Sequence, residues 1–177
     1  DLNSLYPHLI MQYNISPETY VGVETKGMSV ENMLNQQLNL EWAKNKDVAI
    51  SANGAMFRRD KQGFLPELMQ KMYGDRVIYK KKMIEAKKEF QKTKDPIYKN
   101  EIARCHNIQM AKKISLNSAY GAIGNQYFRY FDVKQAEAIT LGGQLSIRWV
   151  ERDVNRFMNK ILNTNNINYV VASDTDS

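Results

Sequence analysis

Two long stretches of helical sequence, separated by one short break, constrain the fold of this chain more than any other feature. From Pro66 to about Lys92 the apolar residues recur at helical spacing, and proline is well tolerated in the first turn of a helix. Thr93-Lys94-Asp95-Pro96 interrupts the pattern, and a second helix is expected to run to about Tyr120. The sequence therefore predicts a helical hairpin.

The predicted hairpin also carries the whole basic excess of the chain. Between Lys71 and Lys113 there are thirteen Lys or Arg residues and five Asp or Glu residues, which gives +8, whereas the net charge of the full chain is +6. An excess of this kind suits a polyanion such as nucleic acid or a nucleoside triphosphate. A merely solvated charged surface is the alternative interpretation.

Helical spacing places certain polar residues of the hairpin on common faces. Arg76, Lys80 and Lys87 fall at i, i+4 and i+11 and therefore share one face of the first helix. One face of the second helix holds Lys113, Asn117, Tyr120 and Gly121. These two faces are expected to line a common anion site.

A short helix is expected to begin after Ser4. Ser4 is a suitable N-cap, Pro7 fits the first turn, and Asn14 ends the apolar pattern. The backbone N–H groups of Ser4, Leu5 and Tyr6 would then lie at a helix N-terminus. Such a terminus attracts phosphate.

Between this helix and the hairpin, the pattern predicts another helix and a small antiparallel sheet. Ser29 is expected to cap a helix that continues to Trp42. Val48–Ala52 and Ala55–Arg59 flank Asn53-Gly54, which is a strong signal for a β-hairpin with a type I′ turn. We therefore expect two or three short antiparallel strands.

One long amphipathic helix is expected after the hairpin. Residues 121–130 are loop-like, and Asp132 with Gln135 resembles a capping box at a helix start. Apolar residues then recur every three or four positions up to Ile161, which predicts a core-facing stripe. Gly142-Gly143 lies in this stripe; because each glycine weakens a helix by about 1 kcal/mol relative to alanine, the pair indicates close approach of another element.

The C-terminal stretch joins an apolar segment to two carboxylates. Val170-Val171-Ala172 is typical of a buried strand, and Asp174 and Asp176 follow it. Alternate side chains of an extended chain share a face, so the two carboxylates would repel each other unless a cation lies between them. A divalent metal is the obvious candidate. For this motif alone, an Asx turn or a helix cap is the alternative.

Length and composition fit one domain of ordinary size with its own core. No apolar run is long enough for a membrane span and no signal peptide is indicated, so we expect a cytoplasmic protein without a membrane partner. The single cysteine, Cys105, offers neither an internal disulfide nor a cysteine metal cluster. The chain starts within one apparent motif and stops just after another, as expected of a segment of a larger protein.

Three motifs, taken in order, resemble those of family B DNA polymerases. They are Asp1-x-x-Ser4-Leu5-Tyr6-Pro7, Lys113-x-x-x-Asn117-Ser118-x-Tyr120-Gly121 and Asp174-Thr175-Asp176-Ser177. The resemblance extends over the whole chain. It implies an α+β fold in which a palm, with a short antiparallel sheet packed on helices, carries a helical-hairpin fingers subdomain, the whole being a fragment of a larger polymerase.

The resemblance also implies how the chain is divided. The palm would comprise residues 1–65 and 122–177, and the fingers residues 66–121. Residues 14–19 and 121–130 look most like the replicative polymerases of T-even-type tailed bacteriophages. A phage protein of this kind would act in the cytoplasm of a bacterial host.

The chemistry implied by the resemblance is template-directed transfer of a nucleotide from a dNTP to the 3′-hydroxyl of a DNA primer. Asp1 and Asp176 would be the principal ligands of two Mg²⁺ ions. Asp174 would be a supporting carboxylate, and the carbonyl of Leu2 a further ligand. Oxygen ligands suit this hard cation, and two ions about 4 Å apart suit an in-line displacement.

The remaining motif residues would hold the nucleotide and the nascent base pair. The groups assigned to the triphosphate are the backbone amides of Ser4, Leu5 and Tyr6 and the side chains of Arg76, Lys80, Lys113 and Asn117. Tyr6 would also be the steric gate beneath the deoxyribose, whereas Tyr120, Gly121 and Thr175 would contact the base pair or the DNA. From the residues alone, Tyr6 would simply staple the first helix, and Tyr120-Gly121 would be a glycine-capped helix end.

Two positions depart from the commonest family pattern. His8 stands where serine usually follows the proline, and Ser173 stands where glycine usually precedes Asp-Thr-Asp. Neither departure removes a metal ligand. The implied partners are primer–template DNA and dNTP, with a sliding clamp and replisome proteins reached through regions outside this chain. The isolated chain is expected to have little or no activity, because its ends cut through the proposed site.

Two other functions remain open. Asp-x-Asp also occurs as a metal site in sugar-nucleotide glycosyltransferases, although this would leave the basic hairpin unexplained. A nucleic-acid-binding module with purely structural carboxylates would bind DNA in a salt-sensitive way, unaffected by Mg²⁺ or dNTP.

Overall fold

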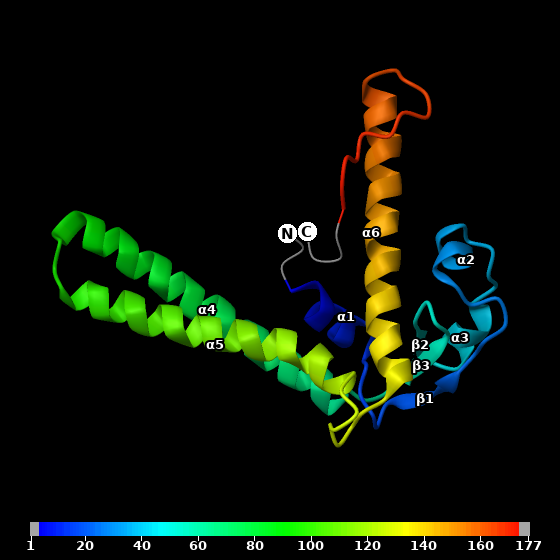
Figure 1. The fold of residues 1–177 in the computed structure, drawn as a ribbon, viewed down its shortest axis with the longest axis horizontal. Helices are drawn as coiled ribbons and strands as arrows, with labels where there is room; N and C mark the ends of the chain where they lie inside the picture. The colour runs from blue at the N-terminus through cyan, green and yellow to red at the C-terminus, as the bar shows by residue number, and fades with distance from the viewer. Residues whose placement is uncertain (1–3, 174–177) are drawn as a thin grey trace.

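The computed structural model describes residues 4–173 of the 177-residue chain. The elements of this part are α1 (Leu5–Tyr13), β1 (Tyr20–Val23), α2 (Val30–Leu34), α3 (Glu41–Asn45), β2 (Val48–Ile50), β3 (Ala55–Arg58), α4 (Phe64–Thr93), α5 (Ile97–Ile123) and α6 (Val133–Ile161). The α4–α5 hairpin and α6 project in different directions from a body that contains α1 and the small sheet (Figure 1). None of the helices in residues 4–173 is long and apolar enough to cross a membrane.

The expected α+β character is confirmed in the described residues, which combine helices with a small antiparallel sheet of order β1-β3-β2. Its central strand, β3, supplies Phe57 to the core, and α1 supplies Ile10. Leu116 of α5 and Ile139 of α6 belong to the same buried cluster. All four side chains are fully buried, so the core lies where the base of the hairpin, α1, α6 and the sheet meet.

The predicted helical hairpin is present. Lys94, in left-handed conformation, ends α4, and the Asp95 carboxylate accepts a hydrogen bond of 2.9 Å from the backbone N–H of Ile97 at the start of α5. The second helix runs beyond Tyr120 to Ile123, so the expected loop at 121–130 was placed too early. Burial of the Ile123 side chain in the core stabilises this additional turn of helix.

An ion pair joins the two helices of the hairpin. The Lys112 ammonium donates a 2.8 Å hydrogen bond to the Asp75 carboxylate, and this bond holds the pKa of the carboxyl below its ordinary value. Closer to the tip of the hairpin, the Arg104 guanidinium donates two hydrogen bonds to the Glu101 carboxylate, and the Cys105 thiol donates a third. These bonds lower the pKa of Glu101 to about 2. The acidic side chains of the hairpin are thus partly committed to internal pairs.

Replacing Asp75 with asparagine is expected to destabilise the chain only above the titration of this carboxyl. Because the pKa of Asp75 is lower in the folded state, the unfolded chain binds the proton more readily, and the stabilisation is lost as pH falls through the folded-state pKa. Urea unfolding of the parent and of Asp75→Asn, measured from pH 7 down to about pH 2, should converge at the acidic end, below the ordinary pKa of about 3.9. A constant difference at every pH would contradict this assignment.

The region between β1 and β2 differs from expectation in one respect. The Ser29 hydroxyl caps α2, as predicted, by accepting a 3.1 Å hydrogen bond from the backbone N–H of Asn32. However, the single helix expected to reach Trp42 was wrong, because α2 ends at Leu34 and Trp42 lies on the separate helix α3. The backbone of Gln36 takes a left-handed φ of 55°, which a continuing helix does not allow.

The β2–β3 hairpin is present, but its type I′ turn was not correctly predicted. A type I′ turn needs positive φ at both central residues, whereas only Gly54 of the Asn53-Gly54 pair has one, at 83°. The backbone N–H of Gly54 donates to the Ser51 carbonyl at 2.8 Å, and the N–H of Ser51 donates to the Ala55 carbonyl at 2.9 Å. These bonds enclose a three-residue loop in which a β-turn is followed by a left-handed glycine.

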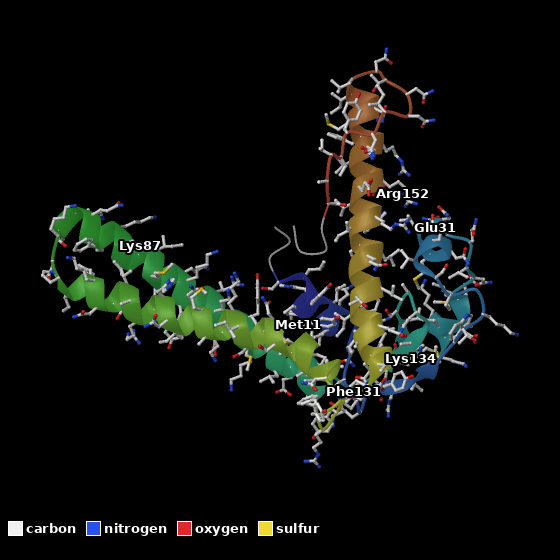
Figure 2. All side chains as sticks on the ribbon, in the orientation of Figure 1. Met11, Glu31, Lys87, Phe131, Lys134 and Arg152 are labelled. Atoms are coloured by element: carbon white, nitrogen blue, oxygen red, sulfur yellow. The ribbon has the colours of Figure 1, made fainter. Side chains whose placement is uncertain are left out.

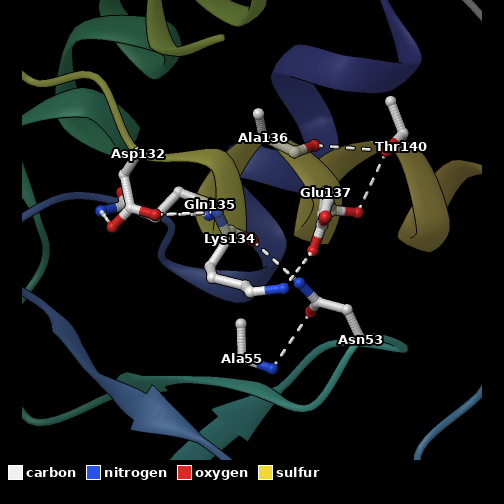
Figure 3. Close-up of polar contacts among 8 residues, drawn as sticks. All are labelled: Asn53, Ala55, Asp132, Lys134, Gln135, Ala136, Glu137 and Thr140. Carbon is white, nitrogen blue, oxygen red and sulfur yellow. Dashed lines mark hydrogen bonds and ion pairs between the residues drawn. The ribbon is translucent and has the colours of Figure 1, made fainter.

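Asn53 is held in this geometry by contacts with the start of α6 (Figure 3). Its side-chain amide donates to the Lys134 carbonyl at 2.9 Å, and its Oδ1 accepts from the backbone N–H of Ala55 at 3.1 Å. Asp132 caps α6 by accepting from the backbone N–H groups of Lys134 and Gln135. The Gln135 amide returns to the Asp132 carboxylate, so the cap is a side-chain version of the expected capping box.

The apolar stripe of α6 was only partly predicted. Ile139 and Gly143 are buried, and another element approaches Gly142-Gly143 closely, as expected; that element is α1, with Leu9 and Tyr13 beside Gly142. Farther along, the stripe does not belong to the core of the described residues. The exposed side chains are Val150 (49%), Val154 (40%), Phe157 (61%) and Ile161 (59%), because the second half of α6 extends past the elements that cover its first half (Figure 1).

The buried strand expected at Val170-Val171-Ala172 was also wrong. This segment is in neither a helix nor a strand of the described chain, and Val171 is fully exposed. The sheet lies near the opposite end of α6 (Figure 1), so the segment has no described strand with which to pair. β-branched residues favour a strand, but they do not provide the partner that a strand requires.

Candidate nucleotide and metal site

The start of α1 lies against the base of the hairpin, and Ser4 makes the connection. Its backbone is left-handed, with φ at 65°, and its hydroxyl accepts a 3.0 Å hydrogen bond from Nη1 of Arg76 on α4. The expectation that Ser4 caps α1 with its side chain was therefore wrong, because a capping serine needs an extended backbone and Ser4 gives its oxygen to a guanidinium instead.

Arg76 brings positive charge to the helix start predicted to bind phosphate. The residue is 8% exposed, so its guanidinium is largely removed from bulk water beside Ser4. The backbone N–H groups at a helix N-terminus carry partial positive charge and point outward along the axis. The Arg76 guanidinium and the start of α1 thus meet at one corner, here called the anion corner, and each is a group that attracts anions.

His8, the first departure from the family pattern, supports this corner. Its Nδ1 lies 2.9 Å from the Ser4 carbonyl oxygen, which also accepts the backbone N–H of His8 at 3.1 Å. The imidazole ring meets Tyr73 of α4 edge-to-face, with centroids 4.6 Å apart. The histidine therefore fixes α1 on α4 without occupying the anion corner.

Tyr6 is enclosed by two other helices. Its ring lies 4.8 Å, centroid to centroid, from that of Tyr120 on α5, at an interplanar angle of 52°. On another side it touches α6 at Gly143, where a Cβ atom would come within 3.1 Å of the Tyr6 ring. The structure thus brings together two site residues that are far apart in sequence.

The other site residues predicted on the α4–α5 hairpin, called the arm below, make no contact like those of Arg76 and Tyr120. Lys80, Lys113 and Asn117 are exposed, and their side chains make no hydrogen bond or ion pair with any described residue. Gly121 is also exposed, with open space around it. Lys87 lies much farther out on the arm (Figure 2), and a helix rise of about 1.5 Å per residue puts it roughly 16 Å beyond Arg76. A single triphosphate at the start of α1 would therefore contact only the residues at the base of the hairpin, and Lys87 would lie too far away.

The proposed metal site falls outside the described residues. The predicted metal ligands are Asp1, Leu2, Asp174 and Asp176, and Thr175, the predicted DNA contact, also lies outside the described residues. Among residues 4–173, no three His, Cys, Asp or Glu side chains are grouped as metal ligands.

The segment that leads toward Asp174 is tied to the end of α6. Asn155 accepts the backbone N–H of Tyr169 at 2.8 Å, and Asn159 donates to the Ile167 carbonyl at 2.7 Å. In the view of Figure 1 this segment turns back and descends beside α6. Sequence reasoning missed these two asparagines; their only signal was their spacing of four on a polar face.

A pocket of about 490 Å³ lies elsewhere, between α1, α2 and α6, and its lining includes His8, Tyr13, Met33 and Trp149. None of the residues predicted to bind a nucleotide lines it. The candidate site is therefore an open corner between helices rather than this pocket.

A basic helical arm set against a phosphate-attracting helix start is typical of a protein that handles polyphosphates or nucleic acid. The family model for DNA polymerase family B matches residues 1–177. The chain belongs to this family.

Individual relatives agree with this membership. The chain is 31% identical to a DNA-directed DNA polymerase of Enterobacteria phage T4 and 29% identical to one of Escherichia phage RB69. Each match covers 100% of this chain and 24% of the relative, so the chain spans about a quarter of the length of these proteins. DNA polymerase 1 of Pyrococcus abyssi is 32% identical over 92% of this chain and 17% of its own length.

A solved structure supports the fold. The family B DNA polymerase of Pyrobaculum calidifontis matches with a TM-score of 0.59 and 24% identity, over 91% of this chain and 18% of that one. The resemblance to a family B polymerase, and to those of T-even-type phages in particular, is thereby confirmed.

Proposed function

We propose that this chain is the catalytic core segment of a replicative DNA polymerase, which transfers nucleotides from dNTPs to a primer 3′-hydroxyl under the direction of a template. The observation that carries the proposal is the contact between Arg76 of the basic hairpin and Ser4 at the start of α1. This contact places a guanidinium from one motif-bearing segment beside the phosphate-attracting terminus of another.

In this proposal the chain divides into palm and fingers. Residues 1–65 and 122–177 form the palm, and residues 66–121 form the fingers. The support is the arm-like α4–α5 hairpin, which leaves the body at the sheet and the start of α6 (Figure 1).

The incoming triphosphate would lie at the anion corner. The N–H groups of Leu5 and Tyr6 donate to its oxygens, and the guanidinium of Arg76 neutralises its charge. Lys80 and Lys113 extend toward the same phosphates from exposed positions, which suits groups that approach a ligand when an arm moves. Asn117, one turn beyond Lys113 on the same helix face, adds a neutral hydrogen-bonding group.

The metal would be held by residues at the two chain ends. Asp1, Asp174, Asp176 and the carbonyl of Leu2 provide only oxygen donors, which is the donor set that Mg²⁺ prefers. When bound, two such ions would activate the primer hydroxyl and stabilise the leaving pyrophosphate.

Aromatic residues would select the sugar and check the base pair. Tyr6 lies beneath the deoxyribose and excludes a 2′-hydroxyl, while Tyr120 supports its ring from α5. Gly121, where the helix surface is open, allows a base pair to approach the backbone closely. Thr175 contacts DNA beside the carboxylates. The enzyme acts in the cytoplasm on primer–template DNA, with clamp and replisome contacts made by other regions.

The experiment that tests this proposal is primer extension by a full-length polymerase carrying residues 1–177. We expect extension that needs template, dNTP and Mg²⁺ together, and little or none from the isolated chain. Preferential binding of a sugar nucleotide over dNTP would favour a glycosyltransferase instead. Salt-sensitive DNA binding without extension, indifferent to Mg²⁺ and dNTP, would favour a binding module.

A further inference from the structure

The Tyr6 ring is positioned by a glycine that the family motifs do not include. Gly143 lies within α6 and is buried, and a Cβ built on it would meet a ring carbon of Tyr6 at 3.1 Å. The same Cβ would come within 3.7 Å of Leu9 and 3.8 Å of Leu5, which are ordinary contacts. Only the tyrosine ring would be forced to move.

The adjacent glycine shows that this closeness is local. A Cβ on Gly142 would meet Tyr13 at 3.4 Å and Leu9 at 3.7 Å, distances that require no displacement. Neither Tyr13 nor Leu9 belongs to the proposed nucleotide site. Gly142 and Gly143 are thus neighbouring, buried glycines of one helix, but only Gly143 lies close to the Tyr6 ring.

The remaining surroundings of the ring limit how it can respond. The Tyr120 ring lies 4.8 Å away from it on α5. Because α6 closes one side of Tyr6, an added methyl group displaces the ring away from α6 by a few tenths of an ångström. Under the proposed function the ring lies beneath the sugar, so this displacement changes how closely the ring and the sugar approach each other.

We propose that Gly143 is a positioning residue that sets how far the Tyr6 ring reaches beneath the sugar of the nucleotide, and thereby sets the discrimination between deoxyribose and ribose. The proposal rests on the function proposed above. Its physical basis is that exclusion of one hydroxyl depends on sub-ångström placement of the excluding group, since misplacement by about 1 Å can change rates by roughly a hundredfold.

The test compares Gly143→Ala with Gly142→Ala in the full-length polymerase, by measuring kcat and KM for a dNTP and for the matching rNTP. For Gly143→Ala we expect the dNTP KM to rise about tenfold with kcat nearly unchanged, and rNTP use to fall further still, as a ring pushed into the sugar position predicts. Gly142→Ala should match the parent. Equal behaviour of the two variants, or a lowered dNTP preference in Gly143→Ala, would overturn the proposal.

Two further variants separate this inference from the proposed function. Tyr6→Ala should lose discrimination against rNTP; if it does not, the role of Tyr6 itself is wrong. In the Tyr6→Ala background, Gly143→Ala should have no additional effect on discrimination, because the coupling passes through the ring. An undiminished effect there would show that Gly143 acts on α6 packing instead. Thermal unfolding of each variant identifies any loss of folding.

Discussion

Replacing Asp176 with alanine in a full-length polymerase that carries this chain is expected to abolish templated dNTP incorporation while primer–template affinity is largely retained. In the proposed function Asp176 is a principal metal ligand, and removal of even one neutral group that stabilises developing charge costs about 10²–10³ in rate. We expect a loss of at least that size. DNA affinity should persist, because it comes mainly from contacts between basic groups and phosphates.

The measurement is single-turnover incorporation together with DNA binding at one fixed salt concentration. Asp60→Ala is a matched control, because it also removes one carboxylate, and Asp60 is exposed and pairs only with Arg58 among the described residues. Loss of incorporation in Asp176→Ala alone, with binding retained, supports the metal assignment. An unaffected rate would return Asp174-Thr175-Asp176 to its alternative interpretation as a turn.

Local sequence signals predicted the elements whose causes are themselves local. The break at 93–96 ends one helix and starts another because Pro96 and the hydrogen bond from the Ile97 N–H to the Asp95 carboxylate act within one turn. Asp132 caps α6 for the same reason. Gly142-Gly143 indicated close approach of another element, which proved to be α1.

The errors arose where a distant residue decides the outcome. Ser4 has the chemistry of an N-cap, but the guanidinium of Arg76, far along the chain, takes its hydroxyl. Asn53 was expected in a type I′ turn, but its amide is held by the Lys134 carbonyl of α6. Val171 has strand propensity yet lies exposed in the described chain. The partners of Ser4 and Asn53, and the lack of a described strand beside Val171, could not be read from neighbouring residues.

The candidate site shows the same division. Helical spacing singled out Arg76 and the family motifs singled out Tyr6 and Tyr120, and the structure places all three at or beside the start of α1. The contact from His8 to the Ser4 carbonyl has no signature in the sequence, and the glycine pair signalled close approach of another element without identifying the Tyr6 ring. Whether Lys80 and Lys113 reach the same anion remains a prediction.

Arg76→Ala is expected to raise the dNTP KM by about 10- to 100-fold, because a hydrogen bond to a charged group contributes roughly 1.5–3 kcal/mol. Arg76 is largely buried beside Ser4, so its charge is less screened by water than that of any exposed lysine of the arm. Arg76→Lys should give an intermediate value, since it keeps the charge but loses the planar fork of donors.

Lys81→Ala is the matched control for this prediction. It removes the same charge from the same helix, but Lys81 is exposed and five residues from Arg76, which turns it about 140° away around the helix. If the arm acted only through its overall positive charge, Arg76→Ala and Lys81→Ala would raise the dNTP KM by the same small factor, and added salt would reduce that effect. A KM effect specific to Arg76, measured in enzyme whose unfolding temperature stays well above the assay temperature, would show that one buried guanidinium at the start of α1, rather than the net charge of the hairpin, holds the triphosphate.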